Sequence, residues 1–317
     1  MTAAVVSFHH ASRFYKTVIG VGDIHLELLP GAYGLIGPNG SGKTTLLNLV
    51  TGMLAPSLGT VRVFGQDPRT DRSILRRIGL CPATDILYPN ISGIRWVQYL
   101  TALHGFSSPE ARQLAEVALE KVGMCANMHR PIGSYSLGMR QRVKLAQAIA
   151  HHPDLLILDE PFNGLDPVGR RELADLLRNW IDEGSSLILA SHVLHEVEAV
   201  TSAFLLIHGG RILATGDAHE VTQMLSGFPV EVQLTGSGLG LVAQQMAQQD
   251  WLTGMQFSES RENLTLRVRD RRPFLDMLAN LATLPGVGIE KVDSPDGSLE
   301  AAFDLLLRVH RGEQGLN

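Results

Sequence analysis

Residues 37–44 constrain the possible folds of this chain more than any other segment. They read Gly-Pro-Asn-Gly-Ser-Gly-Lys-Thr, which has the spacing G-x-x-x-x-G-K-T. An apolar run at residues 33–36 precedes them and a leucine-rich run at residues 45–54 follows, so we expect a buried strand, a loop and a helix. The glycines let several backbone amides point inward, and the helix N-terminus adds partial positive charge. We therefore predict a loop that binds phosphate groups.

This phosphate-binding loop, or P-loop, gives individual side chains separate roles. Lys43 is expected to reach the β- and γ-phosphates of a nucleotide, and the Thr44 hydroxyl is expected to hold Mg²⁺. An aromatic residue upstream, Tyr15, either stacks on an adenine face or is an ordinary edge-strand residue. The residues predicted here to contact a nucleotide are Gly37, Pro38, Asn39, Gly40, Ser41, Gly42, Lys43, Thr44 and Thr45.

Composition limits the class of partner. The 317 residues include 27 basic and 32 acidic side chains, for a net charge of −5, which argues against a nucleic-acid partner. Cys81 and Cys125 are the only cysteines, so we expect neither a disulfide framework nor a cysteine metal site, as in a reducing cytosol. We find no signal peptide and no apolar stretch near the ~20 residues that span a bilayer. A membrane role would therefore depend on a separate partner chain.

Two further apolar runs predict neighbouring strands of a parallel sheet. Residues 155–158 are continuously apolar and lead into two carboxylates, Asp159 and Glu160. Residues 187–190 are also apolar, and His192 follows shortly after them. Ligands of open α/β sheets bind at the carboxyl ends of the strands, so these polar side chains are candidates for one site.

The hydrophobic pattern divides the chain into a large and a small part. Residues 1–225 are expected to form an α/β domain, within which residues 86–135 show helical spacing and form a helical insert. Residues 226–317 follow a β-α-β-β-α-β order, which predicts a small ferredoxin-like domain, with a final helix at residues 299–309. We see no catalytic constellation in this second part, and a regulatory or dimer-stabilising role is expected for it.

Five segments together resemble the nucleotide-binding domain of ATP-binding cassette (ABC) transporters. They are the P-loop, Tyr-Ser-Leu-Gly-Met-Arg-Gln-Arg at residues 135–142, Leu-Asp-Glu-Pro at 158–161, Gly-Leu-Asp at 164–166, and His192. The second segment departs from the Leu-Ser-Gly-Gly-Gln signature but keeps Ser136 and Gly138. It looks like the Tyr-Ser-x-Gly-Met form of bacterial exporter-type cassettes, such as multidrug and ABC-2-like ones. The resemblance covers about residues 4–225, in matching order and spacing.

The resemblance implies both a fold and a mechanism. The fold is a P-loop NTPase of the ABC type, α/β, with a mixed sheet, an antiparallel β-subdomain and a helical subdomain, here followed by the small α+β C-terminal domain. Two cassettes would meet head to tail and enclose two ATP molecules, each between the P-loop of one and Ser136 and Gly138 of the other. The remaining implied roles are Thr44 and Asp159 for Mg²⁺, Glu160 for the attacking water, His192 and Lys43 for the γ-phosphate, Asp166 in the D-loop, and Tyr15 for adenine.

Position 83 departs from the family pattern. The family usually has Gln, occasionally Glu, after the proline, whereas here Pro82 is followed by Ala83 and Thr84. Ala83 cannot ligate Mg²⁺ or orient water, while Thr84 and Asp85 carry oxygens at shifted positions. Because Mg²⁺ readily keeps several waters, we expect an active enzyme. The absence of Gln should weaken metal affinity and communication with the helical insert more than it slows the chemical step.

The expected function is that of an ATP-binding and ATP-hydrolysing subunit that energises a separate integral-membrane permease, of exporter type. Its expected partners are a second copy or a homologous cassette, and the permease, which would hold it at the cytoplasmic face of the cell membrane. One alternative is a soluble ABC ATPase acting on ribosomes or DNA, which the single P-loop and the short insert disfavour. Another is a weakly active nucleotide-dependent regulator, which Ala83 motivates.

Overall fold

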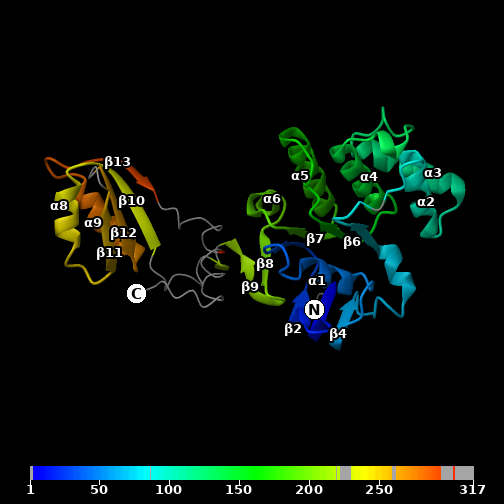
Figure 1. Ribbon diagram of the computed structural model, residues 1–317, viewed down its shortest axis with the longest axis horizontal. Helices are drawn as coiled ribbons and strands as arrows, with labels where there is room; N and C mark the ends of the chain where they lie inside the picture. Colours follow the sequence, from blue (N-terminus) through cyan, green and yellow to red (C-terminus); the bar gives the residue numbers. More distant parts are fainter. Residues whose placement is uncertain are drawn as a thin grey trace. The chain divides into compact units, whose positions relative to one another are not determined.

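The computed structural model describes residues 3–85, 87–218, 220–221, 230–258, 262–293 and 303. The chain divides into two compact units, Met1–Thr215 and Gly216–Asn317 (Figure 1). Each unit contains a hydrophobic cluster of its own. Each is described separately below.

The first unit is built on a six-stranded sheet with the order β5-β6-β7-β3-β8-β9. The strands are β3 (Ala32–Ile36), β5 (Ile78–Cys81), β6 (Leu155–Asp159), β7 (Ser186–Ser191), β8 (Ala203–His208) and β9 (Arg211–Asp217). The pairings from β5 through β8 are parallel. β6 and β7 are buried along their whole length, as their apolar runs predict. This parallel arrangement brings the carboxyl ends of β3, β6 and β7 to one edge of the sheet.

A second, antiparallel sheet in this unit has the order β2-β1-β4. Its strands are β1 (Val6–Tyr15), β2 (Val18–Leu28) and β4 (Leu58–Val63), and β1 pairs with both neighbours through Val6. Helix α1 (Lys43–Val50) follows the P-loop and shares one buried cluster with both sheets. Phe8 of β1, Leu46 of α1 and Ile157 of β6 all belong to that cluster. One core therefore fixes the P-loop helix against the two sheets.

Helices fill the expected insert and lead to the next core strand. They are α2 (Gly93–Leu103), α3 (Ser108–Lys121) and α4 (Leu137–Ile149), with short 3-10 helices η1 (Arg72–Arg77) before them and η2 (Ile132–Ser134) between α3 and α4. Figure 1 shows α2 and α3 beside α4. A capping box formed by Ser107 and Glu110 begins α3, and Trp96 Nε1 of α2 donates to Gln147 Oε1 of α4 at 2.6 Å. Two more helices follow β6 and β7, namely α5 (Pro167–Asp182) and α6 (Leu194–Glu198).

The second unit is a β-α-β-β-α-β structure with an antiparallel sheet of order β11-β12-β10-β13. Its elements are β10 (Val230–Ser237), α8 (Leu239–Met246), β11 (Leu252–Phe257), β12 (Asn263–Val268), α9 (Arg271–Leu281) and β13 (Gly288–Asp293). Alternate strand residues such as Leu264 and Leu266 are buried against Val242 of α8 and Phe274 of α9. Both helices therefore cover the same face of the sheet. The helix expected at residues 299–309 lies, apart from Phe303, outside the described residues.

Within the described residues, no helix combines the length and the apolar character that crossing a membrane requires.

Candidate active site

The P-loop connects β3 to α1, and its backbone depends on glycine. Gly40 (φ 78°) and Gly42 (φ 110°) adopt left-handed backbone angles that favour glycine. At Gly37, an added Cβ atom would lie 2.2 Å from the carbonyl oxygen of Ile207 on β8, so a side chain does not fit there. The loop leads directly into the N-terminus of α1, where unpaired amides and the helix dipole favour an anion.

Two buried polar side chains of the loop are suited to a phosphate group. Ser41 is buried, and its Oγ has no hydrogen-bond partner among the described residues. The buried Lys43 Nζ donates to the carbonyl oxygen of Gly37 at 2.6 Å and lies 3.5 Å from Glu160 Oε1. An unpaired hydroxyl and a buried ammonium at a helix N-terminus supply the donors that phosphate oxygens accept. The residues present therefore fit a nucleotide phosphate.

Thr44 and Asp159 meet where α1 begins and β6 ends. The Thr44 hydroxyl donates to Asp159 Oδ2 at 2.8 Å, and Asp159 is 4% exposed. Burial raises the pKa of Asp159, the hydrogen bond from Thr44 opposes this, the charge of Glu160 adds to it, and the net shift is upward. A buried carboxylate next to a hydroxyl is an oxygen-ligand pair of the kind that Mg²⁺ prefers.

Glu160 follows β6 in a strained conformation, with φ of 52°. Its side chain is 11% exposed, and its carboxylate lies 2.9 Å from His192 Nδ1 and 3.5 Å from Lys43 Nζ. The backbone amide of Glu160 donates to the carbonyl oxygen of Ala190 at 2.9 Å, which fixes the residue against β7. The Glu160 carboxylate is therefore in contact with Lys43 at the start of α1 and with His192 directly after β7.

Ser191 is a residue of this cluster that the sequence prediction left out. Its Oγ donates to Glu196 Oε2 at 3.0 Å and lies 3.4 Å from Glu160 Oε2. Glu196 is buried on α6 and also pairs with Arg170 of α5 at 3.3 Å. The only sequence signal for Ser191 is its position at the carboxyl end of β7, directly before His192.

Tyr15 lies at the end of β1 and is 41% exposed. Its hydroxyl is 3.4 Å from Thr45 Oγ1 on α1, and the Arg13 guanidinium carbon is 5.1 Å from its ring centroid. The ring is therefore held beside the first turn of the P-loop helix while much of it stays exposed. This placement suits stacking on a base, which stays a prediction.

The residues of the signature segment lie at the N-terminus of α4. The N-cap of α4 is Ser136, whose Oγ accepts a hydrogen bond from Met139 N at 3.2 Å. A Cβ on Gly138 would lie 3.1 Å from the carbonyl oxygen of Gly164, so the signature and the D-loop touch within the chain. Asp166 caps α5 by accepting from Gly169 N at 2.9 Å. In the described part of the chain, no hydrogen bond or ion pair joins these residues to the P-loop.

The Asp85 carboxylate, near position 83, is bonded to cationic side chains and is not free to bind a metal ion. Asp85 Oδ2 accepts from Arg140 Nε at 2.7 Å, and Asp85 Oδ1 lies 3.1 Å from Lys144 Nζ. Both cations are on α4. The Asp85 carboxylate is therefore held by α4, the helix that begins at the signature. It does not take the place of the Gln side chain that position 83 lacks.

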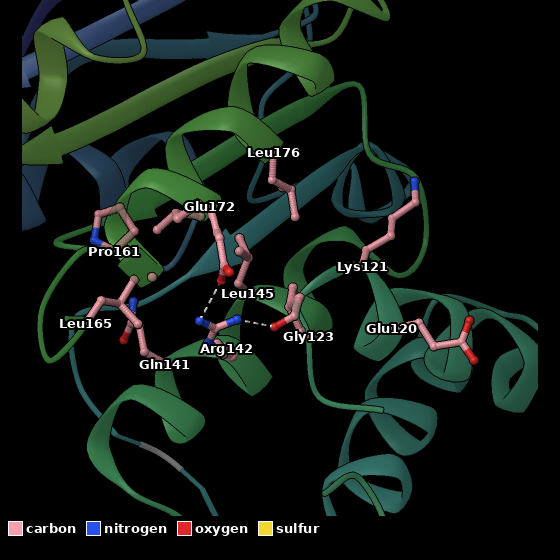
Figure 2. Close-up of a pocket in the computed structure, with 13 residues that line it drawn as sticks. Glu120, Lys121, Gly123, Gln141, Arg142, Leu145, Pro161, Leu165, Glu172 and Leu176 are labelled. Carbon is pink, nitrogen blue, oxygen red and sulfur yellow. Dashed lines mark hydrogen bonds and ion pairs between the residues drawn. The ribbon is translucent and has the colours of Figure 1, made fainter. Parts of the chain in front are cut away.

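A separate pocket of about 230 Å³ lies between the helical insert and α5. Figure 2 shows Arg142 of α4 inside it, next to Leu145 and Leu165. Arg142 donates to the carbonyl oxygen of Val122 and to Glu172 Oε2, at 2.9 Å in each case. The Arg142 side chain thus ties the end of α3 and the helix after the D-loop to α4.

Comparisons with known proteins identify the class to which this site belongs. The model of the ABC transporter family matches residues 21–163. The uncharacterized ABC transporter ATP-binding protein YdbJ of Bacillus subtilis is 31% identical over 92% of this chain and 91% of its own length. Nod factor export ATP-binding protein I of Cupriavidus metallidurans is 31% identical over 87% of this chain and 90% of its own length.

A solved structure supports the same fold. A dimeric ATP-binding cassette, MJ0796, described as a post-hydrolysis state bound to ADP and Pi, superposes with a TM-score of 0.63. Its sequence identity is 21%, and the match covers 67% of this chain and 98% of that chain. The fold and the cluster at the strand ends thus define a P-loop ATPase of the cassette type. The chain belongs to the family of ABC transporter ATP-binding proteins, in which it is the ATP-hydrolysing subunit that energises transport.

Proposed function

We propose that the residues at the carboxyl ends of β3, β6 and β7 carry out ATP hydrolysis. The observation behind this proposal is that the Glu160 carboxylate contacts both the buried Lys43 ammonium and the His192 imidazole at one sheet edge. Phosphoryl transfer requires mainly positioning and charge neutralisation, which these groups supply. Lys43 is assigned to the β- and γ-phosphates and His192 to the γ-phosphate.

Glu160 is proposed as the group that polarises the attacking water. Its carboxylate is held by His192 Nδ1 at 2.9 Å, so one imidazole nitrogen fixes its orientation. In its ionised form the carboxylate accepts a hydrogen bond from water and takes up the proton as the oxygen attacks phosphorus. Lys43 Nζ lies 3.5 Å from the same carboxylate and adds a second contact that holds it in place.

Thr44 and Asp159 are proposed to hold Mg²⁺. Bound Mg²⁺ would neutralise charge on the phosphate oxygens and orient them for in-line displacement. The hydrogen bond of 2.8 Å between Thr44 Oγ1 and Asp159 Oδ2 places both oxygens within one small volume. Burial raises the pKa of Asp159, and a nearby cation would act in the opposite direction and lower it. The stretch Gly37–Thr45 would contact the phosphates, and Tyr15 would stack on the adenine.

We further propose that two chains pair head to tail around two ATP molecules. Among the described residues, Ser136, the N-cap of α4, and Gly138 form no hydrogen bond with the P-loop of their own chain, so they are available to the nucleotide of a partner cassette. Gly164 of the D-loop adjoins Gly138 of the signature. The MJ0796 cassette, which shares this fold, is a dimer in its solved structure, and this supports the idea by similarity. The partner is a second copy or a homologous cassette.

The pairing is tested by light scattering on purified Glu160→Gln protein. The amide keeps the shape of the side chain but cannot take up the proton, so bound ATP should persist. We expect the measured mass to double on addition of ATP and Mg²⁺ and to return to that of one chain with ADP. A monomer at saturating ATP would contradict pairing between identical chains. The control is Asp154→Asn, which alters an exposed carboxylate. It should still hydrolyse ATP, so its dimer should be as short-lived as that of the unaltered protein.

A separate integral-membrane permease is the proposed second partner, with the chain at the cytoplasmic face of the membrane. Membership of the ABC transporter family supports this, because ATP-binding subunits of that family work with membrane permeases. The Cupriavidus relative is named as an export protein, which supports an export direction here. Co-expression with a neighbouring reading frame that encodes several apolar spans tests the proposal. Recovery of the chain in washed membranes only when that frame is present is expected, and equal recovery without it would contradict the proposal.

A further inference from the structure

A buried lysine fastens the segment after β5 to the signature helix. The Lys144 side chain, on α4, is 3% exposed, and its Nζ lies 3.1 Å from Asp85 Oδ1. The same nitrogen donates to the carbonyl oxygens of Pro82 at 3.1 Å and Ala83 at 3.3 Å. Three N–H donors thus meet three acceptors, which satisfies an ammonium that burial would otherwise destabilise. Position 83 takes part through its backbone carbonyl, so alanine is sufficient there.

Asp85 also reaches the end of α4 that carries the signature. Arg140 Nε donates to Asp85 Oδ2 at 2.7 Å, and Arg140 donates from its terminal nitrogen to the carbonyl oxygen of Tyr135 at 2.9 Å. Tyr135 directly precedes Ser136, the N-cap of α4. Arg140 and Lys144 are four residues apart and therefore lie on one face of the helix. A single carboxylate thus links the first turn and the next turn of α4 to the end of β5.

We propose that Asp85 is a positioning residue, which sets where Ser136 and Gly138 are presented to the nucleotide of the partner cassette. This inference rests on the proposed ATP-enclosing dimer. Ser136 does not contact the nucleotide bound by its own chain in the proposed dimer, so its position depends on the bonds that fix α4. Those bonds run through Arg140 and the carbonyl oxygen of Tyr135 to Asp85.

The charge of Asp85 is required for this role. Burial acts to raise the pKa of Asp85, but hydrogen bonds and charge from Arg140 and Lys144 outweigh it, and the pKa is lowered. An amide at position 85 has one acceptor oxygen in place of two, so either Arg140 or the buried Lys144 ammonium would lose its acceptor and face an NH2 group. An unpaired cation is costly in a desolvated site. The segment would then move to regain a partner for that cation, and α4 with it.

The first test measures dimer formation of Glu160→Gln protein that also carries Asp85→Asn. We expect the protein concentration for half-dimerisation at saturating ATP to rise about tenfold, the factor of one lost charge-assisted hydrogen bond. ATP affinity of the monomer, which depends on the P-loop, should stay within about twofold. Asp85→Glu, which restores the charge, should recover most of the loss. Glu116→Gln is the control, because Glu116 pairs with Arg112 on the exposed face of α3.

A second readout does not depend on the dimer. Amide hydrogen exchange of residues 135–140 in the nucleotide-free monomer should be about tenfold faster in Asp85→Asn, and unchanged in Glu116→Gln. If parental Glu160→Gln protein stays monomeric while this exchange increases, the dimer proposal fails and the positioning of α4 by Asp85 stands. Unchanged exchange together with an unchanged half-dimerisation concentration would overturn the positioning role and leave the dimer proposal intact. A uniform increase in exchange across the whole first unit would also overturn it, since that would show general destabilisation.

Discussion

Glu160 has a left-handed backbone conformation that a residue other than glycine adopts at a cost of about 1–3 kcal/mol. In an extended strand, the side chains of Asp159 and Glu160 would point to opposite faces of the sheet. The turn at Glu160 lets its carboxylate reach His192 and Lys43, while Asp159 reaches Thr44. Two neighbouring carboxylates therefore serve two different purposes, and the strain is the structural reason that both are in the site.

Asp159→Asn should stabilise the nucleotide-free protein at neutral pH. The pKa of Asp159 is raised above its value of 3.8 in the unfolded chain, so the folded state binds more protons than the unfolded state as pH passes from 3.8 to the folded pKa. The contribution of Asp159 to the free energy of unfolding therefore falls as pH rises through that window. Above the window, the ionised carboxylate destabilises the folded state. We expect a higher Tm for Asp159→Asn at pH 7, measured without nucleotide, and ATP hydrolysis reduced by at least about 10²-fold.

The matched control for this prediction is Asp154→Asn, which removes a surface carboxylate paired with Arg77. It should leave both Tm and hydrolysis nearly unchanged, because exposed ion pairs contribute little. A Tm at pH 7 that is lower in Asp159→Asn than in the unaltered protein would contradict the idea that burial of the ionised Asp159 carboxylate costs stability.

Ala83→Gln tests the departure at position 83. We expect turnover at saturating Mg²⁺ to change only modestly, while the Mg²⁺ concentration for half-maximal activity falls, because an added amide oxygen would complete the metal shell. The measurement is steady-state hydrolysis as a function of Mg²⁺ concentration. A protein that hydrolyses ATP only with Gln at position 83, even alongside its permease, would favour the weakly active regulator instead.

At the scale of elements, the sequence predicted the strands whose carboxyl ends form the site. The runs at residues 155–158 and 187–190 are continuously apolar, which is typical of central parallel strands, and they are β6 and β7. The Asp85–Lys144 contact could not be predicted, because it joins residues 59 positions apart and neither belongs to a recognisable motif. Ser191 was missed for a similar reason, since one serine at a strand end carries no pattern.

Two stacked histidines join elements of the helical insert to the core. The rings of His104, after α2, and His151, after α4, are 3.7 Å apart at their centroids, and His151 Nε2 lies 3.0 Å from the carbonyl oxygen of Ile78. Burial lowers the pKa of His151 to about 4, with further lowering by His104 and His152. Burial and the charge of Arg76 also lower the pKa of His104.

Acid should therefore destabilise the first unit through His151. The unfolded chain binds a proton at His151 near pH 6.5 and the folded chain only near pH 4, so stability present above pH 6.5 is lost as pH falls through this range. The loss amounts to about 3 kcal/mol at most, at 1.36 kcal/mol per pKa unit. Urea unfolding between pH 7 and pH 4 should show a shallower pH dependence in His151→Gln than in the exposed-histidine control His129→Gln. Equal slopes in the two variants would contradict this.

At the scale of the whole molecule, the chain has two units with separate hydrophobic cores. All residues proposed for ATP chemistry belong to the first unit, and the described part of the second has no group of histidine, cysteine or acidic residues suited to a metal. The regulatory or dimer-stabilising role expected for the second unit stays a prediction. The P-loop, both carboxylates and His192 are all present and in contact through the strand ends, which favours an active transporter ATPase over a degenerate regulator.

The most direct test of this account is the rate of phosphate release from ATP by the purified protein, compared with Glu160→Gln at saturating ATP and Mg²⁺. We predict that turnover falls by about 10²–10⁴-fold in Glu160→Gln, since the amide cannot accept the proton of the attacking water. ATP binding should be retained in that variant. Glu172→Gln, which alters a more exposed carboxylate paired with Arg142, is the control and should stay within about threefold of the unaltered rate. Near-normal turnover in Glu160→Gln would remove Glu160 from its proposed role and contradict the mechanism.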